Sequence, residues 1–289
     1  MQMLMIKEIK PKDFPGRLRE INDPPKKLYV KGELPPDDYK WLCVVGSRKY
    51  TPYGQSVCER LIAGLSGLPV IIVSGLALGT DSIAHRAALS SGLKTVGVPG
   101  SGLNPDVLYP SSSKVLADEI LRAGGALISE FEPNFRATRW SFPQRNRIMA
   151  GLSDAVLVIE AEIKSGTLIT SKLATEYNRD VFAVPGSIFS STSEGPHMLI
   201  RKGAAAIDSA ATLREALGFS ENPKQGELTR DYSGCSPEEK IILEILKTPM
   251  SKEELIDSVE IPLSKLNTII SILEIKKLIK EEMGEIRLN

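Results

Sequence analysis

The chain has 289 residues, of which 42% are hydrophobic and 25% charged, and its 36 basic residues balance its 36 acidic ones. This length suits one large domain and a smaller one. No apolar run reaches the roughly 18 residues that a membrane span needs, and the first residues lack the pattern of a secretory signal. We therefore expect a globular, cytoplasmic protein that does not enter a membrane.

The first 40 residues are rich in proline and charge, as in PKDFP, NDPPKK and ELPPDD. This composition predicts an N-terminal lead-in segment that wraps the next domain without adding a large core. Residues 41–219 then alternate short apolar runs with helical patterns, which is typical of βαβ units. Strands are expected at 42–46, 70–74, 94–98, 126–129, 155–160 and 181–184. Helices are expected at 53–66, 81–91, 112–123, 144–152, 167–178 and 209–217. The pattern predicts an α/β fold with a doubly wound, Rossmann-like, mostly parallel sheet.

Residues 220–235 have the composition of a linker, and residues 236–289 predict a small winged-helix domain of three helices and a hairpin. Ser236 before Pro237 is an expected N-cap, and Ser251 with Glu254 has the spacing of a capping box. Apolar residues recur at helical spacing at Leu263, Leu266, Ile269, Ile270 and Leu273. The segment holds 8 Lys and Arg against 11 Asp and Glu. Because DNA attracts basic surfaces, we favour contact with a partner or a second copy over contact with DNA.

Small and polar residues follow several predicted strands, at 46–48, 74–81, 99–102 and 160–167. The carboxyl ends of parallel strands share one edge of a sheet, where ligands bind. Glycines allow a ligand to approach the backbone, and free N–H groups at helix starts attract anions. One such loop alone is better explained by turning and helix capping, but four on one edge favour a phosphate-bearing ligand. NAD is not expected, because no GxGxxG motif opens the first helix.

Candidate catalytic groups are few. His85 lies on an apolar helical face, where a structural role is the commoner one. Glu160 and Glu162 could form the acid pair of a nucleotide-cleaving enzyme, but they alternate if the strand continues, so we favour a capping or lysine-pairing role for Glu160. Cys43, Cys58 and Cys235 lack the spacing of a zinc site. No catalytic residue, metal or cofactor is expected.

Four arginines and no acid occur between residues 133 and 153, together with three aromatic residues. They are Arg136, Arg139, Arg145 and Arg147, with Phe135, Trp140 and Phe142. Single-stranded nucleic acid binds such segments, because bases stack on the rings while guanidinium groups hold phosphates. A solvated basic face with its aromatic rings packed on the core explains the segment equally well. Its position near 46–48 and 165–167 on one sheet edge favours the ligand site.

Long blocks of the chain resemble the DNA-processing protein A family, also called DprA or Smf, over residues 12 to 218. The blocks are VVGSRKYTPYG (44–54), VSGLALGTDSIAHRAAL (73–89), SGLNPDVLYP (101–110), GGALISE (124–130), FPQRNRIMAGLSDAVLVIEA (142–161), SGTLIT (165–170), NRDVFAVPGSI (178–188) and MLIRKGA (198–204). The resemblance implies a homodimer that is not an enzyme. Such a protein protects single-stranded DNA and loads a RecA-type recombinase onto it during natural transformation, DNA uptake and recombination.

The resemblance also implies a set of residues that bind single-stranded DNA. They are Gly46, Ser47, Arg48, Phe142, Arg145, Asn146, Arg147, Ser165, Gly166, Thr167 and Lys172. Two alternatives stay open from the residues themselves. One is a Rossmann-type nucleotide-phosphate hydrolase, and the other is a nucleotide-binding sensor that signals through the winged helix.

The chain departs from the family pattern at three places. Residues 1–40 leave no room for the helical domain that many members carry at the N-terminus. Leu78 stands where the family commonly has arginine, and Pro196-His197 replaces a small residue and asparagine. These departures imply DNA binding that is weaker or differently tuned.

Overall fold

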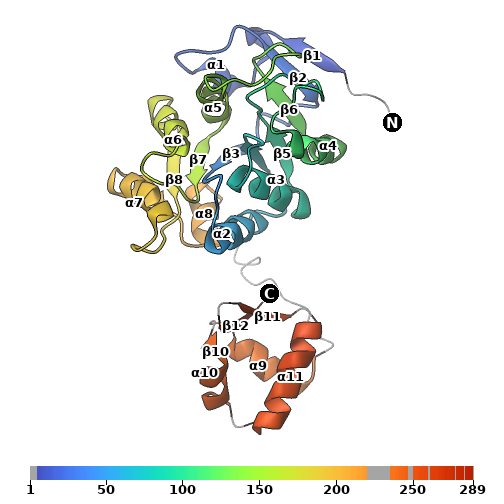
Figure 1. Ribbon diagram of the computed structural model, residues 1–289, viewed down its shortest axis with the longest axis vertical. Helices are drawn as coiled ribbons and strands as arrows, with labels where there is room; N and C mark the ends of the chain where they lie inside the picture. Colours follow the sequence, from blue (N-terminus) through green and yellow to red (C-terminus); the bar gives the residue numbers. More distant parts are fainter. Residues whose placement is uncertain are drawn as a thin grey trace. The chain divides into compact units, whose positions relative to one another are not determined.

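The computed structural model describes residues 5–219, 235–246, 250–259, 261–276, 278–282 and 284–288. The chain forms two compact units, Met1–Glu221 and Asn222–Asn289, and each is described by itself (Figure 1). The predicted linker, 220–235, lies outside the described residues apart from Cys235. Among the helices that the structure describes, none has the length and apolar character that crossing a membrane requires.

In its described part, the first unit contains one sheet in the order β1-β2-β6-β5-β4-β3-β7-β8-β9. The strands are β1 (Ile6–Ile9), β2 (Leu28–Gly32), β3 (Lys40–Val45), β4 (Val70–Ser74), β5 (Lys94–Gly97), β6 (Ala126–Ser129), β7 (Ala155–Val158), β8 (Asp180–Ala183) and β9 (Ala205–Ala206). From β6 to β9 every neighbouring pair is parallel, and β1 and β2 are antiparallel to their neighbours. The predicted doubly wound, mostly parallel sheet is confirmed.

Helices cover both faces of this sheet (Figure 1). They are α1 (Gly16–Arg19), α2 (Pro52–Ala63), α3 (Thr80–Ser90), α4 (Lys114–Arg122), α5 (Ser141–Leu152), α6 (Thr167–Glu176), α7 (Glu194–Arg201) and α8 (Ala210–Ala216). Short 3-10 turns precede α1, α4 and α7 at Pro11–Asp13, Ser111–Ser113 and Ser191–Ser193. The sequence pattern missed α7, whose third residue is Pro196, and started α5 three residues late, because Pro143 is tolerated in a first helical turn.

Strand β3 shows how the two faces are filled. Trp41, Cys43 and Val45 pack with α1, α5 and α6 on one face. The alternate residues, Leu42 and Val44, pack with α2, α3 and α8 on the other. A strand buried on both faces needs a continuous apolar run, and KWLCVV supplies it.

Residues 1–40 contribute more than a wrapping segment, so that part of the prediction is wrong. Strand β2 pairs with β6, and β1 pairs with β2, so both extend the sheet. Phe14, Leu18 and Ile21 are buried in the main core. The strands were missed because IKEI and LYVKG are short and lie next to proline-rich stretches.

The second unit contains α9 (Pro237–Ile245), α10 (Lys252–Asp257) and α11 (Leu263–Ile275). Its described strands, β10 (Met250–Ser251), β11 (Ile279–Glu282) and β12 (Glu285–Leu288), form an antiparallel sheet in the order β10-β12-β11. The N-cap at Ser236 and the capping box of Ser251 with Glu254 are confirmed. Leu266, Ile269, Ile270 and Leu273 are buried as expected, whereas Leu263 is exposed. The name winged helix stays a prediction.

Candidate functional site

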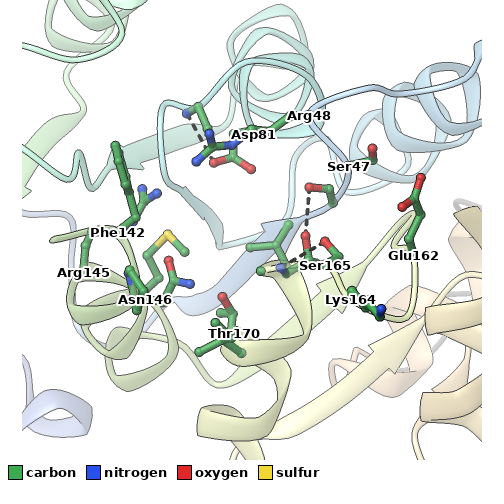
Figure 2. Close-up of a pocket in the computed structure, with 18 of the residues that line it drawn as sticks. Ser47, Arg48, Asp81, Phe142, Arg145, Asn146, Glu162, Lys164, Ser165 and Thr170 are labelled. Atoms are coloured by element: carbon green, nitrogen blue, oxygen red, sulfur yellow. Dashed lines mark hydrogen bonds between the residues drawn. The ribbon is translucent and has the colours of Figure 1, made fainter. Parts of the chain in front are cut away.

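A cleft of about 450 Å³ opens at the carboxyl ends of β3 and β7 (Figure 2). These two strands are neighbours at the point where the strand order reverses, which is where open α/β sheets bind their ligands. Four segments form the walls: the loop after β3, the segment after β4 with Ala77 and Asp81, the loop between β7 and α6, and the first turns of α5. The cleft is lined by nine of the predicted site residues, namely Gly46, Ser47, Arg48, Phe142, Arg145, Asn146, Ser165, Gly166 and Thr167.

Hydrogen bonds join the loops after β3 and β7. The Thr167 hydroxyl donates to the Gly46 carbonyl at 3.0 Å, and the Thr167 N–H donates to Ser165 Oγ at 3.2 Å. The N–H groups of Leu168 and Ile169 donate to the Ser165 and Gly166 carbonyls. These three N–H groups at the start of α6 are therefore already used, so the expectation of free donors there is wrong for them. What the helix start offers an anion is its dipole.

The charge of the cleft is net positive. Its lining holds four cations, Arg48, Lys49, Arg145 and Lys164, and two carboxylates, Asp81 and Glu162. Arg48, Lys49 and Lys164 are exposed, so each can turn toward a bound anion. Lys49, Lys164 and Asp81 were not among the predicted binding residues. Their positions in the sequence could have indicated them. Lys49 and Lys164 adjoin the Gly-Ser-Arg and Ser-Gly-Thr loops, and Asp81 lies at the start of α3.

Arg48 and Phe142 lie together at one wall of the cleft. The guanidinium carbon of Arg48 is 5.3 Å from the centre of the Phe142 ring, within the range of a cation–π contact. The Phe142 ring also lies 5.6 Å from that of Tyr109. Leu78 lines a small pocket that shares Arg48 and Phe142 with the cleft and is also lined by Tyr109. A flat aromatic ring beside a mobile cation is the pairing that a nucleotide base and its phosphate require.

Arg145 is fixed in the floor of the cleft and only 5% exposed. One of its nitrogens, Nη1, donates to the Val98 carbonyl, and its guanidinium packs so closely on Gly75 that any Cβ there would overlap it. Burial raises the pKa of the neighbouring Asp81 carboxyl, and the Arg145 charge opposes that rise. Asp81 in turn accepts the N–H of Gly75 at 3.1 Å. Arg145 thus contributes a fixed positive charge at the floor of the cleft, and its side chain cannot extend toward a ligand.

Two predicted binding residues lie elsewhere. Arg147 donates to Glu130 Oε2 and to the Asp23 carbonyl and lines a separate hollow. The Lys172 side chain is 78% exposed, lies 3.6 Å from Glu176 on the outside of α6, and does not line the cleft. The family resemblance put these residues at the site, but their positions on α5 and α6 turn both side chains away from the cleft.

The candidate catalytic groups have structural partners. Glu160 is buried and accepts the Thr51 N–H, the Thr51 hydroxyl and the Thr192 hydroxyl. It therefore holds the N-terminus of α2, which agrees with a capping role, and it does not line the cleft with Glu162. His85 is buried, and Thr95 Oγ1 lies 2.7 Å from its Nδ1. In the described parts of the chain, no three His, Cys, Asp or Glu side chains gather as a metal site would require.

The fold and the cleft define a doubly wound α/β protein with a positively charged groove at its topological switch point. Residues 5–218 match the family described as DNA recombination-mediator protein A. The chain belongs to this family, as its resemblance to DprA and Smf indicated.

The relatives agree with this assignment. DNA processing protein DprA of Streptococcus pneumoniae is 45% identical over 206 residues, which are 71% of this chain and 72% of that protein. DprA of Bacillus subtilis is 40% identical over 210 residues, with 72% and 70% covered. Protein Smf of Escherichia coli is 42% identical over 206 residues, 71% of this chain and 54% of Smf, so the match spans about half of that relative.

Two solved structures share the fold. The X-ray structure of S. pneumoniae DprA has a TM-score of 0.68 at 40% identity and covers 74% of this chain and 75% of that one. The structure of DprA from Helicobacter pylori has a TM-score of 0.65 at 31% identity, covering 74% and 96%. The latter was described for its unique single-stranded DNA binding mode.

Proposed function

We propose that the chain binds single-stranded DNA in the cleft at the ends of β3 and β7. One observation carries this proposal: exposed Arg48 stacks on Phe142 at the wall of a net positive cleft. Single strands bind where cations follow the phosphates and a ring accepts a base. The H. pylori relative, which was described for its single-stranded DNA binding mode, supports the same ligand class.

The residues that line the cleft have different roles, according to how exposed each side chain is. Arg48, Lys49 and Lys164 hold phosphates, because their side chains can reach the strand. Buried Arg145 adds a fixed positive potential, and a base stacks on Phe142. These contacts order a flexible strand and make its binding sensitive to salt.

Family membership extends the proposal to the biological role. A cytoplasmic homodimer would protect single-stranded DNA and load a RecA-type recombinase onto it in transformation and recombination. No covalent step is proposed, because Glu160 is held by Thr51 and Thr192 rather than facing the cleft. Chromatography of nucleoside monophosphates incubated with the protein should return them intact, whereas released base would favour the hydrolase.

The proposal predicts that Arg48→Ala weakens binding of an oligothymidine by about 1 to 3 kcal/mol, since a charged hydrogen bond is lost. Fluorescence anisotropy at two salt concentrations, with duplex DNA as competitor, measures this loss and the preference for single strands. Arg60→Ala is the matched control, because it removes an exposed charge on α2 outside the cleft. Equal affinity of wild type and Arg48→Ala would refute the assignment of the cleft.

A further inference from the structure

A second hollow of about 630 Å³ lies on the opposite side of α5 from the cleft. Residues 23–27, just before β2, form one wall, and Glu130, directly after β6, forms another. Gln144 and Arg147 of α5 complete it. Strand β2 lies beside β6 and runs antiparallel to it (Figure 1). The residues before β2 and after β6 therefore meet at the carboxyl end of β6, the sheet edge at which the cleft also lies.

Glu130 gives this hollow an unsatisfied acceptor. Its side chain is only 7% exposed. Oε2 accepts from Arg147 and the Gln144 side chain lies beside the carboxylate, but Oε1 is buried and makes no hydrogen bond within the described residues. A buried polar atom without a partner costs free energy. A ligand that brings an N–H group to Oε1 would remove that cost.

The remaining walls suit a flat anionic ligand. Pro24 and Pro25 supply rigid apolar surface. The lining holds three cations, Lys26, Lys27 and Arg147, against the carboxylates of Asp23 and Glu130, so its net charge is positive. Lys27 is already bonded to Glu132 and Tyr29, whereas exposed Lys26 has no ion pair within the described residues. An N–H donor, a flat ring and a negative group occur together in a nucleotide.

Helix α5 connects the two hollows. Phe142 and Arg145 face the cleft, whereas Gln144 and Arg147, two residues later, face the second hollow. Around the start of this helix lie exposed Arg139 and Trp140. An exposed arginine and ring can hold a phosphate and a base, and here they precede the helix that lines both hollows.

We propose that the second hollow binds a further nucleotide of the same single strand and prefers bases that carry an exocyclic amino group. Cytosine and adenine present such a donor to a carboxylate, and thymine does not. The one N–H on the base-pairing edge of thymine, N3–H, lies between two carbonyl oxygens, which the Glu130 carboxylate repels. The proposal rests on single-stranded DNA being the ligand of the cleft.

The test compares the affinities of oligodeoxycytidine and oligothymidine of equal length for the full chain. The ratio should favour cytidine by about fivefold to tenfold in the wild type, and it should fall to near unity in Glu130→Gln, whose amide can donate to thymine. Glu119→Gln on α4, outside both hollows, is the control and should keep the wild-type ratio. Intrinsic differences between the two oligonucleotides cancel, because the test compares the affinity ratio of each variant with that of the wild type.

Lys26→Ala gives a second readout that does not depend on the ion pair of Glu130 and Arg147. It should weaken both oligonucleotides by a common factor of about twofold to fivefold. An unchanged ratio in folded Glu130→Gln, or unchanged affinity in Lys26→Ala, would overturn the second hollow while Arg48→Ala still reports on the cleft. Failure of the wild type to bind either oligonucleotide would instead remove the proposed function.

Discussion

Arg48, Arg145 and Arg147 show how burial gives one residue type three roles. Arg48 is exposed beside a ring and can follow a phosphate. Arg145 is fixed under Gly75, and Arg147 is paired with Glu130. Desolvation lowers the pKa of Arg145, and the neighbouring Asp81 charge opposes this effect. A sequence shows all three as arginine, so it cannot rank them as ligands.

His85 should make stability fall in mild acid. Burial lowers its pKa from 6.5 to about 3. The unfolded chain binds the proton first, so stability from this residue is complete above pH 6.5 and is lost as the pH falls from 6.5 toward 3. The loss between pH 7 and pH 5 should be about 2 kcal/mol.

Urea unfolding of wild type and His85→Gln at the two pH values measures this contribution. The difference in unfolding free energy between pH 7 and pH 5 should be much smaller in His85→Gln than in the wild type, even if the variant is less stable at pH 7. His197→Gln is the control, because His197 is not buried and its Nε2 lies 3.1 Å from the Gly186 carbonyl. Identical pH dependence of His85→Gln and wild type would contradict the buried neutral imidazole.

At the scale of elements, the cleft depends on how closely the strand ends and α5 approach each other. The loop after β4 crosses the Arg145 guanidinium at Gly75. Gly100, after β5, similarly leaves room for the Phe142 ring. Gly46 is required by packing against Thr80 of α3. At these three positions the missing Cβ leaves room for neighbouring side chains, whereas the sequence suggested that it leaves room for the ligand.

Gly75→Ala should therefore destabilise the first unit by about 1 to 3 kcal/mol, the usual cost of overpacking a core. It should also weaken DNA binding, because Arg145 must move. Gly166→Ala is the stability control, since a Cβ there meets no atom within 4 Å. Thermal or urea unfolding measures both variants. A Gly75→Ala protein as stable as Gly166→Ala would show that Arg145 is not held as described.

For the whole molecule, the two units have separate cores. The first unit carries both hollows of the proposed DNA path. The second has its own buried cluster around Leu266 and Leu273. Residues 236–289 carry a net charge of −3, which disfavours a phosphate backbone as their partner.

A fragment of residues 1–221 should bind oligothymidine at least as tightly as the full chain, to within about twofold, because it keeps the cleft and loses acidic residues. Anisotropy titrations of the two proteins at the same salt concentration measure this. Circular dichroism first establishes that the fragment melts cooperatively. A tenfold weaker fragment would mean that the second unit takes part in DNA binding.

Local patterns were enough to predict the sheet class and the edge that carries the site. Apolar runs such as KWLCVV and VIIVS identify strands buried on both faces, and capping residues identify helix starts. Parallel strands then bring the loops at 46–48 and 165–167 together. The lead-in strands β1 and β2 were not predictable in this way, since they exist through pairing with β6.

The sequence by itself determined the fold class and the family, because these follow from short-range periodicity and contiguous motifs. Nine of the eleven residues that the family resemblance implied line the cleft. Only the tertiary structure decided which cations can reach a ligand. Arg145 and Arg147 are two residues apart, yet α5 turns one into the floor of the cleft and the other toward Glu130. That choice depends on burial and on partners distant in sequence, such as Gly75 and Asp23, which no local pattern encodes.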